Sequence, residues 1–270
     1  MNFINIHNTE PYLVSIITPS YNSEKFISMT IDSVLRQTYR NWEMIIVDDA
    51  STDNTCTIIY DYCKKDNRIK LIRLKKNSGA AVARNRAIEK SKGKYIAFLD
   101  SDDIWLPEKL KIQVEFMLKN KHLFTYSAYK KIDEYGIKIG IVGVPEKISY
   151  NGLLKTCVIG CLTAVYDAEM LGKIPMPLIE KRQDFGLWLK ILKRIKFAYG
   201  IKEPLALYRV RHNSISSNKK NAAFFTWKVY RNIERLNIII SIYYFTHYAI
   251  KGILRTKFPR IAKFLGVLDC

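Results

Sequence analysis

Short apolar runs alternate with segments of helical periodicity through the first third of the chain. The apolar runs occupy residues 13–18, 43–47, 69–74 and 95–99, and they have the length and β-branched content of buried strands. Between them and after Pro107, apolar residues recur every three or four positions, which predicts helices. Strands that alternate with helices favour a parallel sheet covered on both faces, so we expect an α/β fold.

The chain beyond this part is less regular. Strand-like runs occur at 123–129 and 205–209, and a helical pattern covers 183–194. The last residues, 218–270, have a helical pattern that is both apolar and basic. The longest uncharged stretch there, 236–250, is interrupted by polar residues and is shorter than the roughly 20 apolar residues of a membrane-spanning helix.

This pattern predicts one main domain with an appendage. We expect the main domain over residues 1–217, with a nucleotide-binding half over 12–110 and a second half over 111–217. A C-terminal helical, basic-amphipathic region over 218–270 follows.

Polar side chains stand where the predicted strands end. They form the segments Pro19–Asn22, Asp48–Asp49 and Asp100–Asp103. In parallel sheets ligands bind at the carboxyl ends of the strands, so these segments mark a candidate site. The third segment holds three carboxylates, whose repulsion a divalent cation would relieve, and oxygen ligands favour Mg2+ or Mn2+. The alternative is that these acids cap the helices that follow them, and Asp53 is expected to do so.

The net charge points to a polyanionic partner. The chain has 44 Lys and Arg against 25 Asp and Glu, a formal charge of +19. Nucleic acid, an anionic membrane face and a phosphorylated substrate are all consistent with this excess. The first 110 residues carry 16 basic and 14 acidic side chains, whereas residues 218–270 carry 10 and 2. The excess therefore lies downstream of the candidate site.

Cysteine usage and the N-terminal residues favour a reducing compartment. The five cysteines form no C-x-x-C pair and no His stands near them at zinc spacing. Residues Met1–Pro11 lack the charged and apolar regions of a signal peptide. We therefore expect a cytosolic protein with free thiols.

Six segments resemble, in order and spacing, the family 2 glycosyltransferases with the GT-A fold, and the resemblance covers roughly residues 12–217. These segments are Val14–Asn22 (VSIITPSYN), Val47–Asp53 (VDDASTD), Asn77–Gly79 with Ala83–Asn85, Phe98–Asp103 (FLDSDD), Gln183–Leu189 (QDFGLWL) and Leu207–Arg209 (LYR). The resemblance implies a Rossmann-like domain that binds a UDP-sugar.

The resemblance also implies roles for individual residues on the donor side. Asp49 is expected to accept the uracil N3–H, and Asp102 to bind the metal, Mn2+ or Mg2+, that offsets the charge of the leaving diphosphate. The remaining donor-binding residues of the matched motifs are Pro19 and Tyr21 at the base and ribose, Asp100 and Ser101 near the ribose or donor sugar, and Arg84 at the diphosphate or base. A solvated helical arginine is the alternative for Arg84.

Asp184 matches the catalytic base of the family, although Gln183 stands where most relatives have Glu. The base would take the proton from the acceptor hydroxyl during a single, inverting displacement. Trp188, one helical turn later, is expected either to pack under the acceptor sugar or to lie in the core. His212 is a further metal-binding candidate because many relatives have a histidine in this segment, with a structural role as its alternative.

The basic, aromatic C-terminal region completes the functional hypothesis. Its cations and apolar residues between 251 and 265 alternate as in an interfacial helix, with a basic solvated face on a packed helix as the alternative. We expect an enzyme peripheral to the inner face of a bacterial membrane, which transfers a hexose, glucose or galactose, from UDP to an undecaprenyl-diphosphate-linked saccharide of O-antigen or capsule. A nucleic-acid-binding protein is the alternative function. A nicotinamide dehydrogenase is disfavoured because no G-x-G-x-x-G follows the first strand.

Overall fold

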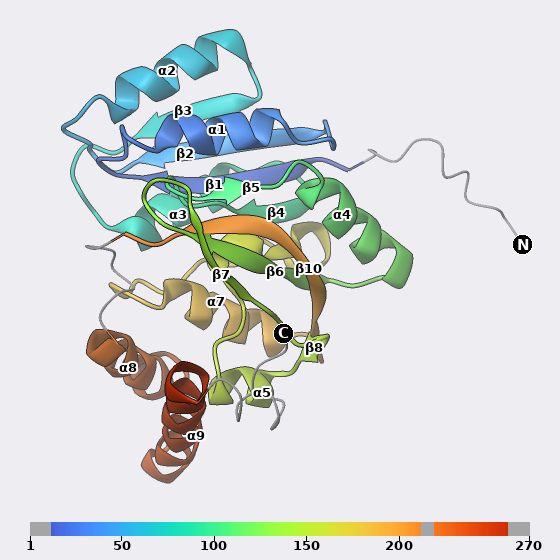
Figure 1. Ribbon diagram of the computed structural model, residues 1–270, viewed down its shortest axis with the longest axis vertical. Helices are drawn as coiled ribbons and strands as arrows, with labels where there is room; N and C mark the ends of the chain where they lie inside the picture. Colours follow the sequence, from blue (N-terminus) through green and yellow to red (C-terminus); the bar gives the residue numbers. More distant parts are fainter. Residues whose placement is uncertain (1–11, 212–218, 259–270) are drawn as a thin grey trace, which may run out of the picture.

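A ten-stranded sheet forms the centre of the molecule in the computed structural model, which describes residues 12–211 and 219–258 (Figure 1). Its main path runs β3-β2-β1-β4-β9-β6-β10-β5. The four predicted strands form the parallel half: β1 (Val14–Ser20), β2 (Trp42–Asp48), β3 (Ile69–Arg73) and β4 (Tyr95–Phe98). Their carboxyl ends lie at one edge of the sheet, as the sequence pattern predicts.

Side chains that alternate along these strands build two cores, one on each face. Ile16 and Met44 belong to a cluster with three helices, α1 (Ile27–Leu35), α2 (Thr55–Lys65) and α4 (Lys109–Asn120). Ile17 and Ile45, one residue further along each strand, pack on the opposite face with α3 (Ala80–Lys90) and α7 (Gln183–Leu192). The period of two in the strands thus produces the expected α/β layers, and the α/β prediction is confirmed.

The second half of the sheet is mixed rather than parallel. The three-residue strand β9 (Val165–Asp167) lies antiparallel between β4 and β6 (Phe124–Ile132). The long strand β10 (Ala198–Arg209) then runs parallel to β6 and brings its carboxyl end back toward Asp103. The remaining strands and helices of this half are short: β5 (Ile104–Trp105), β7 (Lys138–Val142), β8 (Lys147–Ile148), α5 (Tyr150–Lys155) and α6 (Ala168–Leu171).

Two glycines of the first half are required by the backbone. Gly79 precedes α3 with a φ of +91°, a conformation that side chains rarely adopt. At Gly93 a Cβ would lie 2.6 Å from the Leu13 carbonyl oxygen, because the chain passes close to β1. Gly93 therefore stands at a close approach to the sheet, whereas α3 itself ends at Lys90.

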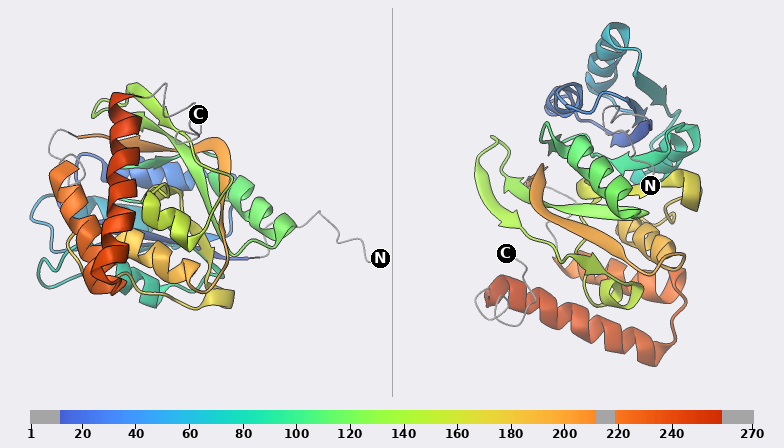
Figure 2. Two further views of the ribbon diagram at one scale, coloured as in Figure 1. Left: turned by 90° about the horizontal axis from the view of Figure 1, so that it is seen from below. Right: turned by 90° about the vertical axis from the view of Figure 1, so that its right-hand side faces the viewer.

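The C-terminal helices pack against the main domain in the described residues. They are α8 (Lys219–Lys228), a π-helical turn (Val229–Ile233) and α9 (Ile238–Lys257), and they lie at the opposite end of the molecule from α2 (Figures 1 and 2). Tyr230 is fully buried and donates a hydrogen bond to the Leu154 carbonyl at 2.5 Å. Glu234, also buried, accepts a hydrogen bond from Tyr150 and forms an ion pair with Lys193. Among the described residues, no helix has the length and apolar character needed to cross a bilayer.

Candidate active site

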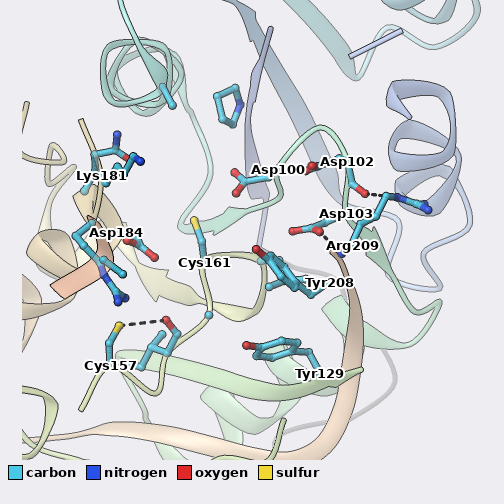
Figure 3. Close-up of a pocket in the computed structure, with 18 of the residues that line it drawn as sticks. Asp100, Asp102, Asp103, Tyr129, Cys157, Cys161, Lys181, Asp184, Tyr208 and Arg209 are labelled. Atoms are coloured by element: carbon cyan, nitrogen blue, oxygen red, sulfur yellow. Dashed lines mark hydrogen bonds between the residues drawn. The ribbon is translucent and has the colours of Figure 1, made fainter. Parts of the chain in front are cut away.

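One large cleft lies at the carboxyl ends of the parallel strands, with a volume of about 1520 Å³ (Figure 3). Its first wall is built by the loops after β1, β2 and β4. Its second wall comes from the segment 180–184 at the start of α7, and residues of α8 and α9 extend that wall. The strand ends and α7, which are distant in sequence, therefore meet around one space.

Asp48 and Asp49 have different tasks in the loop after β2. Asp48 is fully buried and accepts hydrogen bonds from the backbone N–H of Ser51, at 2.9 Å, and from its hydroxyl. Asp49 lines the cleft, and its two carboxylate oxygens accept the backbone N–H groups of Ser78 and Gly79, each at 2.7 Å. Asp48 thus holds the turn, while Asp49 fixes the loop before α3 and keeps acceptor capacity toward the cleft.

The residues expected at the nucleotide base lie beside Asp49. Pro19 and Tyr21 both line the cleft, and Tyr21 is 47% exposed. Ser101 lines the same wall, and its hydroxyl lies 2.8 Å from that of Ser23. An exposed aromatic face beside a fixed carboxylate can stack on a base while the carboxylate accepts a ring N–H.

The three acids after β4 also separate by role. Asp100 pairs with Arg84 at 2.5 Å, and Asp102 pairs with Arg211 at 2.8 Å. Asp103 is buried away from this pairing, where it accepts the backbone N–H of Arg209 at 2.9 Å. Burial raises the pKa of Asp103 well above its usual range. Asp100 and Asp102 therefore face the cleft, and Asp103 anchors β10 to the loop.

Asp102 can serve as a metal ligand, but the described protein residues around it supply only part of a coordination shell. Burial raises the pKa of Asp102, the nearby Asp100 adds to this, and Arg211 opposes it. A divalent cation would stabilise the charged form in the same way as Arg211 does. The structured ranges 12–211 and 219–258 contain no group of three His, Cys, Asp or Glu side chains that could hold a metal. An ion here would need ligands from a diphosphate and water, which is common for Mg2+.

Arg84 connects the two walls of the cleft. Its guanidinium is buried, and it donates to Asp100 and, at 3.1 Å, to the side-chain oxygen of Gln183. Burial lowers the pKa of Arg84, but the charge and hydrogen bond of Asp100 together with Cys161 and Asp184 outweigh it, so the net shift is upward. Arg84 is therefore not a solvated helical arginine. Gln183, which donates to the Glu180 carbonyl at 2.7 Å, is held in place beside Asp184.

Asp184 lies in the first turn of α7 and lines the cleft on the wall opposite Asp100 (Figure 3). The residue before Gln183 is Arg182, whose φ of +66° is unusual for a residue with a side chain. Its guanidinium donates to the Tyr248 hydroxyl on α9 at 2.7 Å. The C-terminal helix thus contacts the turn that carries the predicted base.

Trp188 and His212 were also expected to take part in the site. Trp188 is fully buried, with its ring 5.3 Å from Phe98 and 5.1 Å from Phe124, so it packs in the core and does not reach an acceptor. Of the two alternatives for Trp188, the structure therefore shows the core position, and the acceptor role is wrong because Trp188 is buried and does not line the cleft. His212 lies outside the described residues.

Sequence reasoning missed several residues of the cleft. Tyr129 and Tyr208, whose rings lie 5.9 Å apart, form its floor at the ends of β6 and β10, and Cys161 lies between the two walls (Figure 3). Burial raises the pKa of the Cys161 thiol well above its usual value. Tyr248 and its neighbours on α9 were also missed as cleft residues. Only the aromatic content of the C-terminal region gave a signal for them.

A cleft at the carboxyl ends of a parallel half-sheet, with carboxylates on one wall and Asp184 opposite, is the arrangement that the sequence resemblance implies for a glycosyltransferase of the GT-A class. The sequence pattern of Glycosyl transferase family 2 matches residues 15–152, and the chain belongs to this family. This assignment sets aside the nucleic-acid-binding and dehydrogenase alternatives.

Several named relatives are similar to this chain along nearly their whole length. The putative teichuronic acid biosynthesis glycosyltransferase TuaG of Bacillus subtilis is 49% identical over 88% of this chain and 94% of its own. WfgD of Escherichia coli, a UDP-Glc:alpha-D-GlcNAc-diphosphoundecaprenol beta-1,3-glucosyltransferase, is 44% identical over 92% of this chain and 97% of its own. WfaP of the same species has the same description and is 40% identical over 91% of this chain and 96% of its own.

Solved structures support the fold. The Staphylococcus aureus protein TarS, residues 1–349 in complex with UDP, matches 94% of this chain and 78% of its own with a TM-score of 0.65 at 21% identity. The Pyrobaculum calidifontis mannosyltransferase PcManGT, in complex with GDP-Man and Mn2+, matches 94% of this chain and 79% of its own with a TM-score of 0.66 at 18% identity. At these identities the likeness establishes the GT-A fold.

Proposed function

We propose that this glycosyltransferase moves a hexose, glucose in the first place, from UDP to a sugar hydroxyl of a lipid-diphosphate-linked saccharide. The observation that carries the proposal is the position of Asp184, across one cleft from Asp49, Asp100 and Asp102. The names of WfgD and WfaP, which state UDP-Glc as donor and a GlcNAc-diphosphoundecaprenol acceptor, favour glucose over galactose. The role of TuaG in teichuronic acid synthesis favours a bacterial surface polysaccharide as the product.

The reaction is a single displacement at the anomeric carbon. The carboxylate of Asp184 takes the proton of the acceptor hydroxyl, and the freed oxygen forms a bond to the anomeric carbon. The bond from that carbon to the β-phosphate oxygen of UDP breaks, and its electron pair leaves with UDP. Because the base and the nucleotide residues lie on opposite walls, attack comes from the face opposite UDP and the product has inverted configuration.

The remaining donor-side groups bind and orient the nucleotide. Asp49 accepts the uracil N3–H, and the ring of Tyr21 packs on the base. Arg84 keeps Asp100 and Gln183 in fixed positions, so the two walls stay aligned. Asp102 would hold Mn2+ or Mg2+, which when bound supplies positive charge next to the departing diphosphate.

The proposed setting is the cytoplasmic face of the membrane, with the enzyme peripheral to it. The apolar residues at the start of α9 support this, since Ile238, Ile239 and Ile242 are 50%, 76% and 53% exposed. The basic residues of this region would meet anionic head groups.

A panel of UDP-sugars tests the donor and the reaction together. We expect UDP release from UDP-glucose to rise when a GlcNAc-diphosphate lipid is added, and to be slower with UDP-galactose or UDP-GlcNAc. The glycoside formed should have the β configuration by NMR, because the donor is an α-glycoside. A product of retained configuration would contradict the role of Asp184.

A further inference from the structure

The cations of the cleft differ in whether a carboxylate neutralises them. On the donor wall, Arg84 pairs with Asp100 and Arg211 pairs with Asp102. On the other wall, Arg182 donates to the neutral hydroxyl of Tyr248 at 2.7 Å, and within the described ranges its guanidinium forms no ion pair. Arg182 is thus a cation of the cleft that no carboxylate of the described residues contacts in an ion pair, although Asp184 acts on it at longer range.

The position of Arg182 is costly in two ways. Its side chain is half-buried, and the removal of a charge from water is unfavourable. Its backbone is left-handed at φ +66°, which also costs free energy for a residue with a Cβ. A negatively charged ligand bound by Arg182 would offset the first cost. The neighbouring Lys181 also lines the cleft and has no ion pair in the described part of the chain.

Beyond Arg182 the cleft becomes apolar. Its lining there comes from α8 and α9 and combines small side chains with larger apolar ones: Ala222, Ala223, Phe245, Ala249, Gly252 and Ile253. A Cβ at Gly252 would meet no atom of the described residues within 4 Å, so among these residues this part of the wall has room for a chain to lie against it. Burial of an apolar chain here would be favourable by the hydrophobic effect.

Three features therefore follow one another on this wall: the base Asp184, the unpaired cation Arg182 two residues before it, and the apolar α8–α9 surface that Arg182 contacts through Tyr248. A prenyl-diphosphate sugar has its groups in the same order, with the reacting hydroxyl, the diphosphate and the hydrocarbon chain. We propose that Arg182 binds the acceptor diphosphate and that the α8–α9 surface holds the first part of the prenyl chain. This inference rests on the proposed function.

The inference specifies the acceptor more closely. Because Arg182 and Asp184 are two residues apart, only a short saccharide can span from the diphosphate to the reacting hydroxyl. The expected acceptor therefore carries its reacting hydroxyl on the sugar that is itself attached to the diphosphate, and not at the end of a long oligosaccharide.

Equilibrium binding without donor tests the site independently of catalysis. The two ligands are GlcNAc-diphosphate-farnesyl and the uncharged farnesyl glycoside of GlcNAc, titrated into the full chain by calorimetry. We expect Arg182→Gln to weaken binding of the diphosphate ligand about tenfold or more, as for the loss of a charge-assisted hydrogen bond, and to leave the uncharged ligand unchanged. Arg182→Lys, with the same backbone cost, should restore most of the affinity.

Controls separate this result from unfolding and from general charge. Lys64→Gln removes one exposed positive charge on α2, and all variants should bind UDP like the wild type. Tyr248→Phe is the second variant, for the case that Arg182→Gln misfolds and loses UDP binding. It keeps the guanidinium of Arg182 but removes its hydrogen-bond partner, and it should weaken binding of the diphosphate ligand while leaving binding of the uncharged ligand unchanged.

The inference would be overturned if Arg182→Gln lost the same affinity for both ligands, or if its affinity for the diphosphate ligand were unchanged. The proposed function fails on a different result, namely that the wild type forms no glycoside from UDP-glucose with either acceptor. Since binding is measured without donor, the two failures are distinguishable.

Discussion

At the scale of single residues, the two cleft aspartates after β4 are distinguished by their partners. Asp102 faces Arg211 in the cleft, whereas Asp100 is held by Arg84. We expect Asp102→Asn to abolish the stimulation of UDP binding by Mn2+, because the protein ligand of the ion loses its charge. Asp184→Asn on the opposite wall is the matched control and should keep that stimulation. Calorimetry with UDP, with and without Mn2+, measures both, and full stimulation in Asp102→Asn would refute the metal assignment.

A buried lysine gives a second residue-scale prediction. Lys109 is fully buried, and its ammonium lies 3.7 Å from the centre of the Trp105 ring without a hydrogen-bond partner among the described residues. Burial lowers the pKa of Lys109 well below its usual value. The unfolded chain therefore binds more protons between the two pKa values, and the free energy of unfolding rises with pH across that window.

Lys109→Met should accordingly raise the free energy of unfolding at pH 7 by about 1–3 kcal/mol, since the cost of burying the amine exceeds the lost cation–π contact. Its advantage over the wild type should shrink toward pH 10. Urea denaturation at both pH values measures this. The exposed Lys111→Met on the same helix should change stability by less than about 0.5 kcal/mol. An advantage that is constant with pH would show that the amine does not titrate with folding.

Residue identities in the donor wall were predictable from sequence, whereas in the second wall only Asp184 was among the expected site residues. Asp49, Asp100 and Asp102 follow strands whose carboxyl ends must meet, so period and topology place them together. Trp188 shows the limit of this reasoning. A helical aromatic near Asp184 faces the cleft or the core according to a rotation that the sequence does not determine, and here Phe98 and Phe124 enclose it.

At the scale of elements, the regular first half was predictable and the mixed second half was not. The strand β9 has three residues and pairs antiparallel on both sides, and such a short run carries no periodicity. From the sequence, the packing of the C-terminal helices on the main domain was only the alternative to an interfacial helix. It depends on a few long-range contacts, such as that of Tyr230 with Leu154.

Glu234 tests how the C-terminal helices are anchored to the main domain. Its carboxylate is 1% exposed and bonds to Tyr150 on α5 and to Lys193, at 2.6 Å, next to α7. We expect Glu234→Ala to lower the free energy of unfolding by about 1–3 kcal/mol, with the half-exposed Lys193 contributing little of this. Hydrogen exchange should accelerate in α9 and remain unchanged in α3. The exposed Glu203→Ala is the control, and equal protection of α9 in both variants would contradict the anchoring role.

At the scale of the whole molecule, most of the net positive charge and most of the exposed large apolar residues lie downstream of the donor half of the chain. The isoleucines of α9 lie at the opposite end of the molecule from α2 (Figure 1). An interfacial docking of this end would bring the cleft wall formed by α9 next to the lipid phase that holds the acceptor. The formal charge of +19 then contributes to attraction to an anionic surface.

Vesicle partitioning tests that arrangement. Changing Ile239 and Ile242 to Glu should reduce binding to anionic vesicles at least about tenfold, because two apolar insertions are lost and two negative charges are added. Tyr60→Glu, which changes an aromatic that is 57% exposed on α2, should have little effect. Sedimentation with vesicles measures the bound fraction, and transfer to a short-chain acceptor in detergent should be preserved. Unchanged partitioning of the double variant would exclude α9 as the docking element.

The most direct test of the central claim is the transfer of labelled glucose from UDP-glucose to a GlcNAc-diphosphate lipid in the presence of Mn2+, with Asp184→Asn compared with the wild type. The account predicts a glycosylated lipid product for the wild type and a rate lower by a factor of about 10² or more for the variant, with UDP affinity retained. Wild-type rates in Asp184→Asn, or UDP release without any glycosylated lipid in the wild type, would contradict it.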